Sequence, residues 1–199
     1  MRRKTFDALA VIGGLILAVV LLVAGGLLLW GHDFVNDQVH TQLAAQRIYF
    51  PPASSGAIKA LPATDAQAMT AYAGQQMTTG AQAQAYADHF IAVHLREIGG
   101  GKTYAQLSAA ALANPKNTAL AEQVQTVFRG ETLRGLLLNA YGFWKMGQIM
   151  LIGAIVAFAA AAVLLIMSVL GIVHLRRAPA EAEVFGGDTT TSRQAAPAV

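Results

Sequence analysis

Two long apolar runs dominate the hydrophobic pattern, and neither contains a charged side chain: Ala8–Trp30 and Ile149–Val173. A helix of about 20 apolar residues, rising 1.5 Å per residue, crosses the roughly 30 Å hydrocarbon layer of a bilayer. The pattern therefore predicts two transmembrane helices, over residues 8–30 and 147–174. A cleaved signal peptide is the alternative for the first run, although the apolar part of such a peptide normally spans only about 7–15 residues.

The segment between the two runs has the period of helices. Val35, Val39 and Leu43 recur at every fourth position, so a helix should extend beyond the first run. No stretch of β-branched residues alternates with a period of two, as a half-buried strand would. The sequence predicts an all-α fold, with two transmembrane helices flanking an extracytoplasmic helical domain of residues 31–146.

Start and stop signals divide this domain further. After a loop over residues 53–62, Thr64 and Gln67 have the spacing of a capping box, in which each side chain bonds the backbone of the other residue. Thr103 and Gln106 repeat this spacing after three glycines of the kind that end helices. The signals predict helices over residues 65–78, 81–98, 103–114 and from 118 onward.

The last of these helices is expected to continue into the second apolar run. From Leu133 to Met150 there is no proline, and a glycine inside a helix costs only about 1 kcal/mol. We therefore expect one unbroken helix, with Gly142 as the place where it would bend. Its amphipathic start carries an apolar side made of Leu120, Val124, Val127 and Phe128.

Basic residues stand on the terminal side of each predicted span. Short flanks rich in Lys and Arg stay in the cytoplasm, so both termini are expected on the inner side of the plasma membrane. The residues that set this orientation are Arg2, Arg3, Lys4, Arg176 and Arg177. Residues 1–7 would be a cytoplasmic N-terminus, and residues 175–199 a disordered cytoplasmic tail.

The opposite ends of the spans carry aromatic and basic residues. Aromatic side chains are typical of the membrane–water interface, and the candidates here are Trp30, Tyr141, Phe143 and Trp144. Three basic residues stand on the same side, namely Arg129, Arg134 and Lys145. They would either bind outer-leaflet phosphates or form a solvated face in which Arg134 pairs with Glu131, three residues away.

Small residues recur within both spans and allow helices to approach closely. They are Gly14, Ala18 and Gly25 in the first span, and Gly153, Ala157 and Ala161 in the second. The pattern fits packing of the two spans against each other, and it also fits a homodimer face. The third interpretation is that Gly and Ala are simply frequent in this chain.

Composition narrows the classes of function. The chain is 55% hydrophobic and only 13% charged, against about 25% charged in a typical soluble domain. Charges in the middle of the chain nearly balance, so there is no basic footprint for nucleic acid. The chain has no cysteine, which excludes disulfides, thiolate metal sites and cysteine nucleophiles.

Two stretches each contain part of a known cofactor-binding pattern, but neither contains all the residues that the pattern requires. Gly99-Gly-Gly-Lys-Thr103 is similar to the end of a phosphate-binding loop, but that loop needs another glycine where Arg96 stands, so nucleotide is not expected. Asp88, His89, His94 and Glu97 crowd one helix. The two histidines are about 140° apart around its axis, so no metal or other cofactor is predicted.

The stretches Gly99–Leu107 and Phe128–Gly142 also carry a family resemblance. Over roughly residues 8–177 the chain resembles an uncharacterised family of two-pass membrane proteins of high-GC Gram-positive bacteria. Some members are labelled aromatic ring-opening dioxygenases, which need iron held by His and carboxylate ligands. The histidines here do not converge in this way, so the resemblance implies a topology and no catalytic residues.

The sequence therefore favours a non-enzymatic role. We expect an interaction or envelope-assembly module on the outer face of the plasma membrane, because no nucleophile–base pair and no intramembrane charge is evident. Its partners would be the lipid bilayer and either a membrane protein or a second copy of the chain. The alternative is a ligand- or lipid-binding sensor whose outer domain signals through the transmembrane pair.

Overall fold

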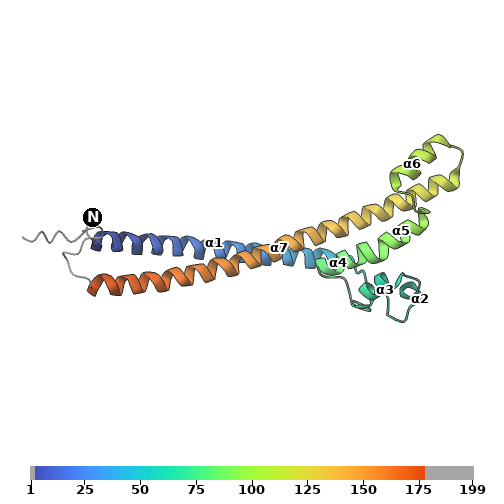
Figure 1. The fold of residues 1–199 in the computed structure, drawn as a ribbon. Coiled ribbons are helices and arrows are strands. Elements are labelled where there is room, and N and C mark those ends of the chain that lie inside the picture. The colour runs from blue at the N-terminus through green and yellow to red at the C-terminus, as the bar shows by residue number, and fades with distance from the viewer. Residues whose placement is uncertain (1–2, 178–199) are drawn as a thin grey trace, which may run out of the picture. The chain divides into compact units, whose positions relative to one another are not determined.

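The computed structural model describes residues 3–177, and throughout this range the regular elements are helices (Figure 1). The predicted all-α class is confirmed for this part of the chain. The elements are α1 (Arg3–Ala45), α2 (Gly56–Lys59), α3 (Ala63–Thr70), α4 (Gly80–Tyr86), the π-helix η1 (Ala87–Ile91), α5 (Ala92–Ile98), α6 (Tyr104–Ala113) and α7 (Thr118–Arg177). Of the tail predicted over residues 175–199, residues 175–177 form the end of α7 and the rest lies outside the described residues. Arg2 and the side chains of Arg3 and Lys4 also lie outside them.

The chain divides into two compact units. In the described residues, the first unit consists of residues 3–28 and 152–177, which are the two apolar halves of α1 and α7. The second unit is residues 29–151, which contains the remaining halves of both helices and all the shorter ones. Each long helix extends past the limits predicted for its span, since α1 starts at Arg3 and α7 ends at Arg177.

Helix α7 is unbroken over 60 residues, as the sequence predicted. Gly135 and Gly142 lie inside it with open space around them, so neither is required there for a close approach. Helix α1 is likewise one element and carries the predicted stripe of Val35, Val39 and Leu43. It ends at Ala45, where the chain turns and Arg47 adopts a left-handed backbone conformation with φ of 53°.

The core of the second unit forms where α3, α4 and η1 cover α1 and α7. Leu43 of α1 and Leu137 of α7 are almost fully buried in it, together with Phe50. The ring of Phe50 packs against Tyr72 and Tyr86, each with a centroid distance of 5.3 Å. Hydrogen bonds between residues 48–50 and 74–77 fix the segment that carries Phe50.

A smaller cluster joins α6 to the first part of α7. Leu107 is buried there against Val124 and Val127, two of the residues predicted on the apolar side. The capping box predicted at Thr103 and Gln106 is present and starts α6. Gln123 of α7 also donates to the carbonyl oxygen of Ile98, so both α5 and α6 contact the first part of α7.

The helix predicted over residues 65–78 is shorter than expected. Helix α3 ends at Thr70, and the predicted capping box at Thr64 is wrong, because the helix starts after Pro62 without a side-chain cap. The chain instead turns at Gly74, with φ of 73°, and brings Gln76 opposite Tyr49. The capping box of this region belongs to Thr79 and Gln82, which start α4.

Two further differences concern local geometry. Within the expected loop over residues 53–62, Ser55 caps the short helix α2 by accepting from the backbone N–H of Ile58. The helix predicted over residues 81–98 is interrupted by η1, whose wide turn shifts the faces of the residues that follow. Ile98, the last residue of α5, is exposed.

The tightest backbone approach in the core generates a stability prediction. A Cβ atom added at Gly80 would lie 2.6 Å from the Cγ of Trp144 and overlap with its Cβ, which the backbone of α7 holds in place. We expect Gly80→Ala to lower the free energy of unfolding by about 1–3 kcal/mol, as overpacking does. Denaturant or thermal unfolding of the purified protein measures this.

The matched control is Gly135→Ala on α7, where nothing lies within 4 Å of the added methyl group. Alanine forms helices better than glycine, so this variant should be neutral or up to about 1 kcal/mol more stable. Equal effects of the two substitutions would contradict the proposed contact between Gly80 and Trp144.

Candidate functional site

In the first unit, the predicted small residues lie where α1 and α7 face each other. Ala18 and Ala161 have no exposed surface, and Ala157 is buried. A Cβ at Gly14 would lie 2.7 Å from Ser168 Oγ, and one at Gly25 would lie 2.8 Å from the ring of Phe158. The two helices thus use their own small residues for close packing within one chain.

Sequence analysis missed part of this contact. Gly171 approaches Val11, where an added Cβ would lie 2.6 Å from the methyl carbon, and Ser168 is the one polar side chain buried in this pair among the described residues. A Cβ added at Gly153, which was predicted, would lie 3.2 Å from Cδ1 of Leu28. The sequence shows that Ser168 and Gly171 stand three positions apart on one helix. It does not show their partners on α1, which are more than 150 positions away in the chain.

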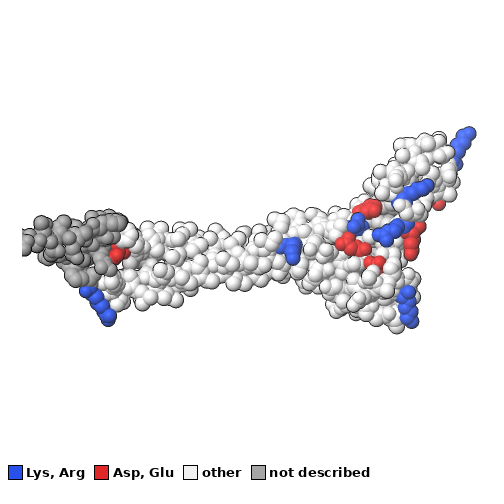
Figure 2. All heavy atoms as spheres, viewed as in Figure 1, with Lys and Arg blue, Asp and Glu red and all other residues white. Residues whose placement is uncertain are grey.

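The outward surface of this pair is apolar. Both helices are long and apolar enough to cross a membrane, and only 17% of the most apolar window of each is buried. A core helix of a soluble protein would be mostly buried, so these side chains lack a cover within the chain. Figure 2 shows almost no charged residue along this pair except near one end.

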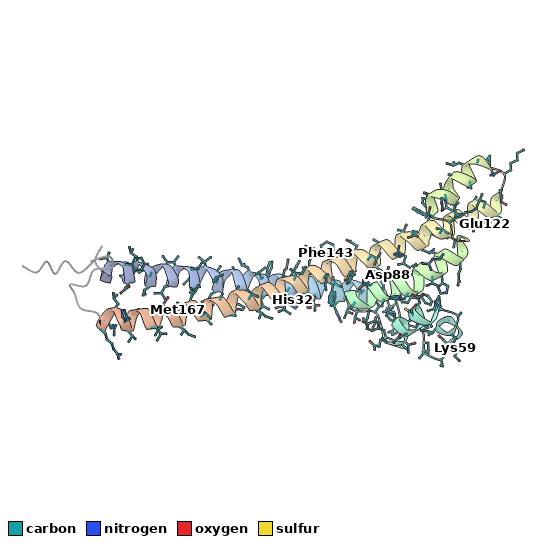
Figure 3. The ribbon with its side chains drawn as sticks, viewed as in Figure 1. His32, Lys59, Asp88, Glu122, Phe143 and Met167 are labelled. Atoms are coloured by element: carbon teal, nitrogen blue, oxygen red, sulfur yellow. The ribbon has the colours of Figure 1, made fainter. Side chains whose placement is uncertain are left out.

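The predicted interface aromatics have different environments. Trp30 is exposed and stacks on Phe34, with ring centroids 5.7 Å apart. Trp144 instead packs against Gly80 at the core of the second unit, and Tyr141 lies beside it at 6.2 Å. Phe143 is exposed at the wall of a groove described below (Figure 3).

The predicted basic residues separate in the same way. Arg134 pairs with Asp88 at 3.0 Å and with Glu131 at 3.6 Å, so its charge is compensated within the fold. The pair with Glu131 follows from sequence spacing. The pair with Asp88 could not be inferred, because it is made by a separate helix. Arg129 and Lys145 are exposed.

The histidines and carboxylates of the suspected metal helix have partners of their own. His89 Nδ1 lies 2.7 Å from Asp65 Oδ1, and the ring of His94 donates to the carbonyl oxygen of Phe90 at 2.7 Å. Within residues 3–177, no three His, Asp or Glu side chains come together as a metal site would require. Burial in the same region raises the pKa of the Tyr86 phenol.

A concave site lies between α1 and α7 in the second unit. This groove has a volume of about 420 Å³, within the roughly 300–1,000 Å³ range of small-molecule pockets. Its apolar lining comes from Phe34, Val35, Val39, Leu43, Leu136, Ala140 and Phe143. Its polar lining consists of four amides, Gln38, Gln42, Gln46 and Asn139.

The four amides give the groove its chemistry. All four side chains are exposed, and the contact between Gln42 and Gln38 is long, at 3.5 Å. Each primary amide offers two donors and a carbonyl acceptor, and none of these is charged. Gln38, Gln42 and Gln46 recur every fourth residue beside the Val35–Leu43 stripe, a signal that the sequence contained and that the predictions did not use.

Two other cavities have ionisable walls. One of about 230 Å³ in the second unit is lined by Arg96, Lys102 and Arg134, next to the Gly-Gly-Gly loop. The other, of about 410 Å³ in the first unit, is lined by Asp7, Ser168 and His174. One carboxylate oxygen of Asp7 has no hydrogen-bond partner in the part of the chain that is described. Neither cavity combines apolar walls with converging neutral groups as the groove does.

Comparisons of the chain with protein-family models, with curated proteins and with solved structures found no match. The function must therefore be argued from the chemistry of the helix pair and of the groove.

The close packing within the first unit generates a prediction with a neighbouring control. Ala161 has no exposed surface at the contact of α1 with α7, whereas Ala162 faces outward. We expect Ala161→Leu to force the helices apart and lower the unfolding free energy by about 1–3 kcal/mol, and Ala162→Leu to have little effect. Unfolding in detergent micelles measures both, and equal effects would contradict the packed face.

Proposed function

We propose that the chain is a two-span protein of the plasma membrane that acts as a non-enzymatic interaction or envelope-assembly module on the outer face. The observation that carries this proposal is the pair of apolar helices whose side chains have no cover within the chain. Lipid supplies such a cover. An apolar surface of this length in water would associate with other molecules instead.

The orientation that we propose follows from charge. Arg2, Arg3 and Lys4 precede the first span, and Arg176 and Arg177 follow the second, so both termini would be cytoplasmic. Residues 31–146 would then form the outer domain, carrying the core, the ion pairs and the groove. The intramolecular contacts at Gly14, Gly25 and Gly171 support packing of the two spans within one chain over the homodimer face.

A binding role suits the groove better than catalysis does. Its amides donate and accept hydrogen bonds, but they do not exchange protons near neutral pH as a general acid or base must. Apolar walls with a few converging polar groups are typical of ligand sites. The groove therefore supports a binding role, and not a catalytic one, for the proposed module.

A ligand- or lipid-binding sensor is the second candidate, and one observation favours it. The groove is built on α1 and α7, the two helices that continue as the proposed spans. A ligand that fits only one spacing of α1 and α7 would favour that spacing by its differential affinity. The same helices would then carry the change toward the membrane.

The topology is tested by single cysteines, because the chain has none of its own. We expect Ser54→Cys, in the loop before α2, to react with a membrane-impermeant thiol reagent on intact cells. Ser192→Cys, in the C-terminal segment, should react only after the membrane is permeabilised. Labelling of Ser192→Cys in sealed cells would overturn the orientation, and labelling of neither variant would place the domain inside.

A further inference from the structure

We propose that the groove between α1 and α7 binds a glycolipid of the outer leaflet, holding its neutral sugar headgroup on the amides and the adjoining part of an acyl chain on the apolar walls. This inference rests on the proposed topology, which places the groove on the outer face. The class of ligand follows from three properties of the groove: its neutral lining, its mixture of amides and hydrocarbon, and the order of these groups along the helices.

The lining excludes charged headgroups as the preferred ligand. No Asp, Glu, Lys, Arg or His is among the residues that line the groove. A phosphate or carboxylate buried there would lose its hydration without gaining a cation, and this is costly. Lys145 and Arg129 are exposed on α7 but do not line it. The groove therefore selects a neutral ligand.

The amides exclude a purely hydrocarbon ligand. A saturated chain laid over Gln38, Gln42 and Asn139 would cover their donors and acceptors without bonding them, and a covered polar group without a partner is unfavourable. A sugar presents several hydroxyl groups, each able to donate and to accept. Such a headgroup satisfies amides of either orientation, and its apolar ring faces can pack on Phe34 and Phe143.

The order of the lining residues matches a lipid that is partly lifted from the bilayer. Counted along α1, the groove begins at Phe34, four residues after Trp30, and ends at Gln46, about 18 Å farther at 1.5 Å per residue. Phe34, Val35 and Phe143 line the end that is nearer to the proposed spans in the sequence, and the amides occur from the middle to the far end, where Val39, Leu43 and Leu136 continue the apolar wall. An acyl chain would thus enter next to the bilayer, with the headgroup beyond it.

The experiment uses the full-length protein in nanodiscs that contain three lipids with identical acyl chains: diglucosyl diacylglycerol, diacylglycerol and phosphatidylglycerol. Native mass spectrometry of the protein released from these discs measures which lipid it retains. We expect the diglucosyl lipid to be retained about tenfold or more over either competitor. Loss of one amide hydrogen-bond pair, about 1.4 kcal/mol, corresponds to that factor.

Three variants localise the binding. The double variant Gln42→Leu, Asn139→Leu removes two exposed amides and should abolish the preference for the sugar, whereas Gln125→Leu, on an exposed part of α7 away from the groove, should keep it. Ala140→Phe fills the groove and should reduce retention of every lipid. If that variant fails to fold, the surface double variant still decides, because neither of its positions is buried.

The outcomes separate the parts of the argument. Equal retention of diacylglycerol would overturn the role of the headgroup, and preferential retention of phosphatidylglycerol would overturn the neutral site. If the double variant still prefers the diglucosyl lipid, the binding site lies outside the groove. If the unmodified protein retains the three lipids equally, the proposal of a glycolipid ligand is wrong. Nanodiscs expose both faces of the protein, so the lipid retention does not depend on which face is outside in the cell. The cysteine labelling tests the topology separately.

Discussion

The close antiparallel approach of α1 and α7 is the interaction on which the rest of the structure depends. In the first unit it rests on small residues, with Gly14 against Ser168 and Gly171 against Val11. In the second unit, Gly31 faces Met150 and the ring of His32 donates to the carbonyl oxygen of Gly147 at 2.9 Å. Such contacts fix the register of the two helices, and in this register residues 34–46 of α1 and residues 136–143 of α7 line the groove together.

The continuity of both helices has a physical cause in the proposed membrane setting. A break at the bilayer edge would leave backbone N–H and C=O groups without partners, which costs several kcal/mol, whereas a glycine retained inside a helix costs about 1 kcal/mol. This inequality explains why Gly142 and Gly147 are tolerated within α7. It also places the groove on two continuous helices rather than on loops, which suits a site that must keep its amides in position.

The sequence predicted those features that depend on local pattern. The two apolar runs, the Val35–Leu43 stripe and the cap at Thr103 each require only residues a few positions apart. The errors arose where tertiary contacts overrode local signals. Thr64 lies inside α3, which starts at Ala63, so it does not cap that helix. After Thr70 the chain leaves the helix and Gln76 pairs with Tyr49, and the capping box of this region starts the next helix at Thr79. Only part of the groove could be predicted from the sequence. Gln38, Gln42 and Gln46 recur at every fourth position of one helix, whereas Asn139 comes near them only in the folded chain.

The apolar walls and the amides of the groove have different effects on binding. Each methylene of an acyl chain that leaves water contributes about 0.8 kcal/mol, but a chain leaving lipid gains little of this, so the apolar walls cannot draw a lipid out of the bilayer unaided. The amides are exposed in the free protein, and burying them without partners costs about 1–3 kcal/mol each. The net balance therefore turns on whether the ligand satisfies Gln38, Gln42, Gln46 and Asn139. A groove of this composition discriminates by headgroup, and its apolar part serves to keep the ligand at the membrane surface where the headgroup can be bound.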